Sequence, residues 1–261
     1  MLSSPQNKRI KELLLLQQKS SHRRQQGMFV VEGRRELRQC LDAGYAVESV
    51  YLCPDLLQSG EPVGGLSRCI VTEVSRGVYE KIAYRGSTEG VVAVVRQPGL
   101  RLDSLSLPPS PLVVVLESVE KPGNLGAVLR SADASGVDAV IVCDPLCDIY
   151  NPNTIRASIG AVFTVPCLSC TSEECIDFLK RHDIRILTAQ LQDSHPYYDT
   201  PMTSATAIVM GTESTGLTAP WRQAADAHIR IPMLGNLDSL NVSVSAAILM
   251  YEAVRQRMGK G

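Results

Sequence analysis

Residues 112–130 read LVVVLESVEKPGNLGAVLR, and they indicate the fold class more clearly than any other segment. Leu112–Leu116 is an unbroken apolar run, which predicts a strand that is buried on both faces of a sheet. A polar loop with glycine follows it, and the next residues predict a helix over Gly123–Ser135. A buried strand followed at once by a helix is typical of a parallel α/β sheet.

The chain after this stretch continues to alternate between predicted strands and predicted helices. We expect further strands at Ala139–Val142, Arg185–Thr188, Ala207–Met210 and His228–Ile231. Helices are expected near Asn153–Ile159, at Ser172–Arg181, and from about Ser239 to Met258. At least five strands joined by helical crossovers predict a mostly parallel sheet flanked by helices.

The chain before this stretch predicts a second, smaller domain. Four prolines in Arg96–Pro111 break both periodicities, so we interpret this segment as a linker between domains at 1–105 and 106–261. Upstream of it we expect an α/β/α sandwich. Its helices are predicted at Asn7–Gln18, at Arg34–Ala43, and in a third segment that Thr72 caps and that ends at Ile82. Its strands are predicted at Met28–Val31, Val47–Leu52, Cys69–Val71 and Gly90–Val95.

Composition excludes some classes of protein and favours others. The 261 residues are 44% apolar, which argues against disorder, yet no apolar run approaches the ~18 residues of a membrane span. The N-terminus has no signal-peptide pattern, so we expect a cytoplasmic protein without a membrane partner. Net charge is −1, but residues 1–38 carry nine basic and three acidic side chains. That local excess predicts a polyanionic partner or, equally, a solvated helix face.

The eight cysteines do not predict a metal centre. Cys167 and Cys170 have the gap of a zinc knuckle, but there is no second such pair and no histidine near them. We therefore expect no metal and interpret most cysteines as small buried hydrophobes.

Three polar loops with glycine follow three buried strands, which is where ligands bind in open α/β sheets. Familiar nucleotide motifs fail in them. Gly123 and Gly126 give only part of a dinucleotide fingerprint, and Leu217 stands where a P-loop needs lysine. No serine has the surroundings of a hydrolase nucleophile elbow.

Long motifs at residues 118–142 (SVEKPGNLGAVLRSADASGVDAVIV), 208–218 (IVMGTESTGLT) and 229–254 (IRIPMLGNLDSLNVSVSAAILMYEAV) occur in order. Together with NPNTIRASIGAVFTVP at 151–166, they resemble the SpoU/TrmH branch of the SPOUT RNA methyltransferases over roughly residues 111–257. Lys121 departs from the aspartate of many members. The basic N-terminal region, with GMFVVEG at 27–33, is similar to the ribosomal-protein-like substrate-binding domain of many members.

This resemblance implies a trefoil-knotted catalytic domain, S-adenosylmethionine as cofactor, a homodimer, and methyl transfer to a ribose 2′-hydroxyl. The implied catalytic residues are Asn124, Arg130, Glu213, Ser239 and Asn241. The implied cofactor-binding residues are Thr188, Ala189, Gln190, Gly211, Glu213, Gly216, Ile231, Met233, Ser239 and Leu240. For phosphate contacts we choose Lys8, Arg9, Lys11, Arg23 and Arg24 from the basic region.

Simpler roles remain open for several of these residues. Asn124 and Ser239 can each cap a helix, Arg130 can form a surface ion pair, and Glu213 can be a solvated loop acid. The separate N-terminal domain favours ribosomal RNA as the substrate, with transfer RNA as the alternative. A non-catalytic RNA- or ribosome-binding relative and a small-molecule enzyme are the competing hypotheses.

Overall fold

A computed structural model describes residues 1–57, 69–84, 89–212 and 215–259. The chain forms two compact units, the first made of Met1–Gly99 with Tyr150–Thr164, and the second of Leu100–Ile149 with Val165–Gly261. None of the helices described is long and apolar enough to cross a membrane. The division of function between residues 1–105 and 106–261 stays a prediction.

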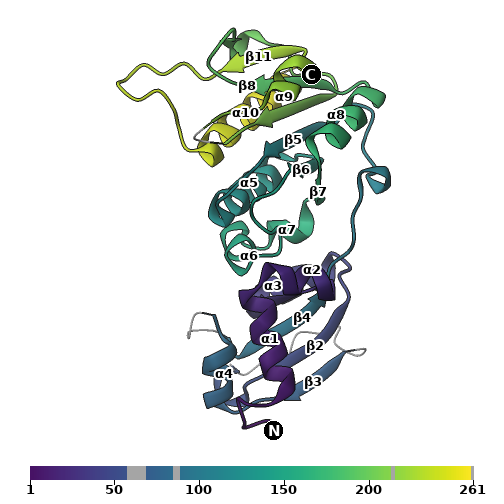
Figure 1. Cartoon of the computed structure of the whole chain (residues 1–261), viewed down its shortest axis with the longest axis vertical. Helices are drawn as coiled ribbons and strands as arrows, with labels where there is room; N and C mark the ends of the chain where they lie inside the picture. The colour runs from purple at the N-terminus through teal and green to yellow at the C-terminus, as the bar shows by residue number, and fades with distance from the viewer. Residues whose placement is uncertain (58–68, 85–88, 213–214, 260–261) are drawn as a thin grey trace. The chain divides into compact units, whose positions relative to one another are not determined.

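The second unit is built on a seven-stranded sheet in the order β7-β6-β5-β10-β8-β11-β9, and every neighbouring pair is parallel. The labels of β5, β6, β7, β8 and β11 locate this sheet in Figure 1. This confirms the prediction of a mostly parallel sheet. The trefoil knot implied by the resemblance stays a prediction. The strands are β5 (Leu112–Glu117), β6 (Ala139–Cys143), β7 (Cys167–Cys170), β8 (Arg185–Ala189), β9 (His195–Pro196), β10 (Thr206–Met210) and β11 (Ala227–Arg230).

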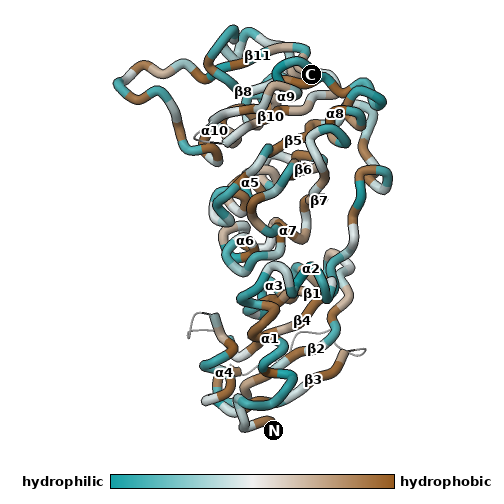
Figure 2. The backbone as a smooth tube through the Cα atoms, in the orientation of Figure 1, coloured by the Kyte–Doolittle hydropathy of each residue, from teal (hydrophilic) through white to brown (hydrophobic). Residues whose placement is uncertain are grey.

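Helices cover both faces of this sheet. Val113 and Val115 of β5 pack in a core with Phe178 of α8 and Trp221 of α9. On β10, α10 packs beside α5. All six residues of β5 are buried, and its hydrophobic character is visible in Figure 2. Because helices cover both faces of the sheet, the run Leu112–Leu116 is continuously apolar. The helices are α5 (Pro122–Ser135), α8 (Ser172–Arg181), α9 (Ala219–Ala224) and α10 (Val242–Met258), with short 3-10 turns η2 (Leu102–Ser104) and η3 (Tyr197–Asp199).

The first unit holds a four-stranded sheet in the order β1-β4-β2-β3. β4 runs antiparallel to both neighbours, and β2 runs parallel to β3. Helices α1 and α4 pack on one core of this sheet through residues such as Leu13 and Tyr79. The elements are α1 (Lys8–Gln18), α2 (Ser20–Gln26), β1 (Met28–Glu32), α3 (Arg34–Asp42), β2 (Val47–Leu52), η1 (Pro54–Leu56), β3 (Ile70–Glu73), α4 (Arg76–Ile82), β4 (Val91–Arg96), α6 (Pro152–Ser158) and α7 (Ala161–Thr164).

Two helices begin about three residues later than predicted. Thr72 lies inside β3, and the hydroxyl of Ser75 caps α4 by accepting a hydrogen bond from the Val78 amide. The last helix begins at Val242 with Asn241 as its cap, so Ser239 lies in the preceding loop. Three residues of delay are within the usual error of locating caps from sequence.

Candidate functional site

A cavity of about 430 Å³ lies beyond the carboxyl ends of β8, β10 and β11. Parallel strands bring the residues that follow them to one edge of the sheet, so three separate loops meet there. The volume lies within the usual range of small-molecule sites. The walls are formed by residues 189–192, 210–212, 215–217, 229–231, 238–240, and by Arg222, Met233, Val242 and Ser245.

The loop after β10 makes its tight turn with two glycines. A Cβ on Gly211 would lie 2.3 Å from the backbone carbon of Gly216, closer than any real side chain allows. Gly216 has φ +68°, and its amide donates a 3.1 Å hydrogen bond to the carbonyl of Thr212. The Thr215 amide donates to the Thr212 hydroxyl at 3.0 Å. This turn exposes backbone groups to the cavity without side chains in the way. Glu213 lies outside the described residues.

The walls of the cavity combine polar and apolar residues. Gln190 lines it, and its Nε2 donates to the carbonyl of Gln192 at 2.9 Å, whereas its Oε1 is buried and accepts no hydrogen bond from the residues described. Ile231, Met233 and Leu240 supply apolar surface. The cavity therefore fits a ligand with both a polar and an apolar part.

A second cavity of about 160 Å³ adjoins the first, since Gly211, Thr212 and Val242 line both. Its other walls are residues 116–121 and Asn124. The side-chain Nδ2 of Asn241 donates to Asn124 Oδ1 at 3.1 Å, and this bond joins the start of α10 to the first turn of α5. Two adjoining cavities can hold a donor and an acceptor of a transferred group.

A buried carboxylate that the sequence interpretation missed anchors the loop between the two cavities. Glu117, 3% exposed at the end of β5, accepts bonds from the Thr218 amide at 2.9 Å and the Thr218 hydroxyl at 2.6 Å. Arg222 donates twice to the Leu217 carbonyl, at 2.9 and 2.7 Å. An acid at the end of an otherwise apolar strand was the signal that could have identified Glu117.

Most of the residues predicted for the cofactor do line the first cavity. Thr188 does not line it, because it is fully buried and its hydroxyl lies 2.6 Å from Nδ1 of His228. Its role as a cofactor contact stays a prediction, and Glu213 lies outside the described residues. The residues that line the cavity are Ala189, Gln190, Gly211, Gly216, Ile231, Met233, Ser239 and Leu240.

The predicted catalytic residues are brought together only in part. Asn124 and Asn241 are bonded to each other, and Ser239 lines the first cavity with its hydroxyl 3.4 Å from Asp238. Arg130 is exposed on α5 and lines neither cavity. Its catalytic role stays a prediction.

Four of the five predicted phosphate contacts are exposed in the first unit: Lys8, Arg9 and Lys11 on α1, and Arg24 on α2. Arg23 is 1% exposed, and its guanidinium donates to the carbonyls of Leu16 and Gln17 at 2.7 and 3.0 Å. It holds α1 against α2 and is not available to a phosphate. The prediction for Arg23 is therefore wrong.

Known proteins resemble this chain along its whole length. The sequence model of the SpoU rRNA Methylase family matches residues 111–251, and that of the MRM3-like substrate binding domain matches residues 7–93. The chain is 34% identical over 239 residues to the 23S rRNA (guanosine-2′-O-)-methyltransferase RlmB of Escherichia coli (strain K12), covering 89% of this chain and 90% of that protein.

Two crystal structures share the fold. One is an RNA 2′-O ribose methyltransferase, 40% identical with a TM-score of 0.84 over 98% of this chain and 99% of that one. The other is the SpoU methyltransferase AviRb from Streptomyces viridochromogenes in complex with AdoMet, 27% identical with a TM-score of 0.90 over 97% of this chain and 99% of that one.

Proposed function

Since the chain belongs to the SpoU rRNA methylase family, we propose that it transfers a methyl group from S-adenosylmethionine to a ribose 2′-hydroxyl of ribosomal RNA. The observation that carries this proposal is the pair of adjoining cavities at the carboxyl edge of the sheet. The larger one suits the methyl donor, and the smaller one suits the ribose. A ribosomal RNA substrate supports a cytoplasmic location for the enzyme.

The cofactor is held by the larger cavity in this proposal. The Gly211–Gly216 turn offers backbone groups to the adenosine, and Ile231, Met233 and Leu240 cover its apolar faces. S-adenosylmethionine supplies an electrophilic methyl group, so the protein has to align the hydroxyl and stabilise the charge that develops on it.

Asn124 and Arg130 contact the RNA substrate in this proposal. The amide of Asn124, fixed by Asn241, orients the ribose in the smaller cavity. Arg130 binds the phosphate that flanks the reacting nucleotide and stabilises the developing alkoxide.

Two measurements on the full chain test this function. Calorimetry is expected to give one S-adenosylmethionine per chain, and labelled methyl is expected to enter ribosomal RNA from cells that lack the enzyme. Absence of cofactor binding at millimolar ligand overturns the methyltransferase. Label that enters only transfer RNA overturns the substrate, and binding to RNA without transfer supports the non-catalytic alternative.

We further propose that residues 1–105 capture the RNA and that the protein is a homodimer through residues 106–261. Exposed cations on α1 and α2 support the first point. For the second, α10 exposes 48% of Val244 and 49% of Tyr251, which is apolar surface that a partner subunit can cover. Sedimentation at micromolar protein tests the dimer, and a monomeric mass contradicts it.

A further inference from the structure

Three cysteine sulfurs converge at one edge of the seven-stranded sheet, and none of these cysteines lines either cavity. Cys143 is the last residue of β6, Cys170 the last residue of β7, and the two are paired in register. Cys175 lies in the first turns of α8. All three sulfurs lie within 4.8 Å of one another, and those of Cys143 and Cys170 are 4.0 Å apart.

We propose that Cys143, Cys170 and Cys175 form a binding site for a thiophilic d¹⁰ cation, Zn²⁺ or Cu⁺. Metal–sulfur bonds of about 2.3 Å place the sulfurs around such an ion about 3.8–4.0 Å apart. The observed spacing needs only a small inward movement to reach this geometry. Thiolate ligands select Zn²⁺ or Cu⁺ over Mg²⁺ and Ca²⁺.

The two carboxylates near the cluster are occupied by other hydrogen bonds, so the three sulfurs are the protein ligands of the proposed site. Asp144 accepts bonds from the Ser172 amide and hydroxyl at 3.1 and 2.6 Å. Glu174 accepts from the Thr171 amide and hydroxyl at 2.8 and 3.1 Å. Both carboxylates are thus engaged in capping α8, while their charges still favour a cation nearby. A fourth ligand of Zn²⁺ is then a water, whereas Cu⁺ needs only the three sulfurs.

Burial differs among the three in a way that suits an entry path. Cys143 and Cys175 are fully buried in the core beneath α8, and Cys170 is partly exposed at its edge. An ion can reach the cluster past Cys170 and is then shielded by the other two. A cation at this position would link the side chains of β6, β7 and α8.

The fold also explains why the sequence pattern argued against a metal. The pair considered there, Cys167 and Cys170, lies within one strand, where residues three apart point to opposite faces. Leu168 and Cys170 belong to the core under α8, and Cys167 does not. The partners of Cys170 come from β6 and α8 instead, which the sequence spacing does not reveal.

The test titrates Cd²⁺, a spectroscopic probe for thiolate sites, into the reduced full-length protein. The ultraviolet thiolate-to-metal band is expected to saturate at one equivalent. Cys170→Ser, chosen because its side chain is partly exposed, is expected to weaken binding by roughly 100-fold or more, since even changes beyond the ligands cost 10–100-fold. Cys167→Ser, in the same strand, is the control and should bind like the wild type.

Two further arms need no variant. Competition with chromogenic chelators for Zn²⁺ and for Cu⁺ tells which ion binds more tightly, and X-ray absorption of the loaded protein should count three sulfur neighbours. A titration without saturation, equal binding by Cys170→Ser, or fewer than three sulfurs overturns the proposal. In each of those results the cysteines are packed thiols only.

Discussion

The side chain of Asn241 serves two contacts at once. Its Oδ1 accepts from the Ser243 amide at 3.0 Å and so caps α10, while its Nδ2 donates to Asn124 at 3.1 Å. A residue that caps a helix and fixes a neighbour couples the start of the helix to the geometry of the smaller cavity. Capping of α10 and support of Asn124 therefore coexist in one side chain.

Arg130→Ala is expected to lower methyl transfer by about 100-fold or more, because it removes charged donors that act mainly in the transition state. Cofactor affinity should stay within a few-fold, since Arg130 lines neither cavity. Single-turnover transfer and calorimetry measure the two quantities. Arg181→Ala on the exposed side of α8 is the control, and full activity of Arg130→Ala refutes its role.

Gly211→Ala is expected to weaken cofactor binding by at least tenfold, a loss of about 1.4 kcal/mol. The added Cβ would collide with backbone atoms of Gly216 and Leu217, so the turn has to open. Gly77→Ala, in α4 with no atom within 4 Å of the new Cβ, is the matched control. Unchanged affinity in Gly211→Ala would show that the tight turn is not part of the cofactor site.

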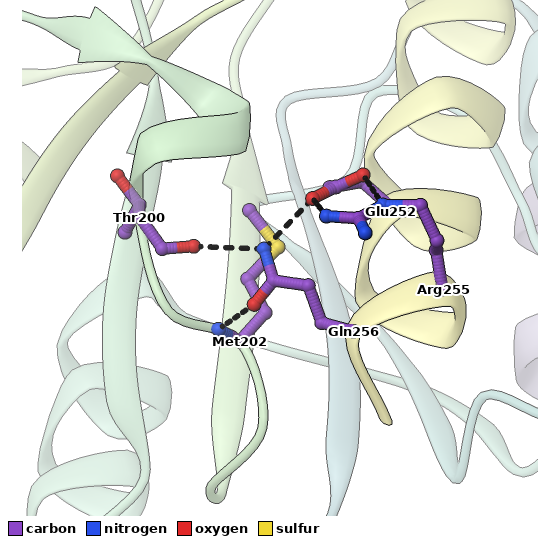
Figure 3. Close-up of polar contacts among 5 residues, drawn as sticks. All are labelled: Thr200, Met202, Glu252, Arg255 and Gln256. Carbon is purple, nitrogen blue, oxygen red and sulfur yellow. Dashed lines mark hydrogen bonds and ion pairs between the residues drawn. The ribbon is translucent and has the colours of Figure 1, made fainter. Parts of the chain in front are cut away.

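At the level of elements, the end of α10 is tied to the loop before β10 by Gln256 (Figure 3). Its Oε1 accepts from the Met202 amide at 2.7 Å, and its Nε2 donates to the Thr200 carbonyl at 3.1 Å and to Glu252 at 2.8 Å. The hydrogen-bonded guanidinium of Arg255 lowers the pKa of Glu252, so this acceptor stays ionised at neutral pH. One glutamine thus joins a helix and a loop.

Gln256→Ala is expected to lower the free energy of unfolding by about 1–3 kcal/mol, since it leaves buried backbone groups without their partners. Urea denaturation measures the change. Gln223→Ala on the exposed side of α9 should stay within about 0.5 kcal/mol of the wild type. Equal stability of both variants contradicts the role assigned to Gln256.

Elements with strong patterns could be predicted from the sequence. The apolar run of β5 specifies a strand with cover on both faces, and the loops after β8, β10 and β11 do meet at one cavity. The strand β7 was missed because CLSC is short and mixes apolar with polar residues, and the two-residue β9 was missed as well. Tertiary pairing, and not local preference, makes these segments strands.

The prediction of the site from the sequence was limited by side-chain orientation. The sequence placed Thr188 at the right strand end, but alternation along β8 directs its hydroxyl to His228 and leaves Ala189 at the cavity. Arg23 and Arg24 are adjacent in sequence, yet one is buried and the other exposed. A sequence gives the position of such residues more readily than the face on which they lie.

For the whole molecule, the separation of charge predicts how RNA binding depends on salt. Replacing the four exposed cations of α1 and α2 by glutamine should reduce the slope of log K against log salt by roughly 0.7–0.9 for each phosphate that the variant no longer binds. Cofactor affinity should not change. Lys180→Gln with Arg181→Gln is the control in the second unit, and an unchanged slope in the first variant contradicts the RNA-capture assignment. The four cations replaced in the first variant are Lys8, Arg9, Lys11 and Arg24.

Arg23→Gln should behave differently from that variant. Because its guanidinium is buried and bonded to two carbonyls, the change should lower the free energy of unfolding by about 1–3 kcal/mol. The salt slope of RNA binding should stay that of the wild type when folded protein is compared. A reduced slope with unchanged stability would restore Arg23 to the phosphate contacts.

The strand order has a consequence for how the protein is made. β5 pairs β6, which follows it closely, but its other neighbour is β10, and the partners Leu112 and Thr206 are about ninety residues apart. At ~5–20 residues per second, a ribosome needs roughly 5–20 s to synthesise the intervening chain. During that time the open edge of this buried strand is available to other chains. Aggregation of the nascent chain is therefore most sensitive to whatever delays β10, and a translational pause between β5 and β10 should lower the yield of folded protein more than one placed after Met210.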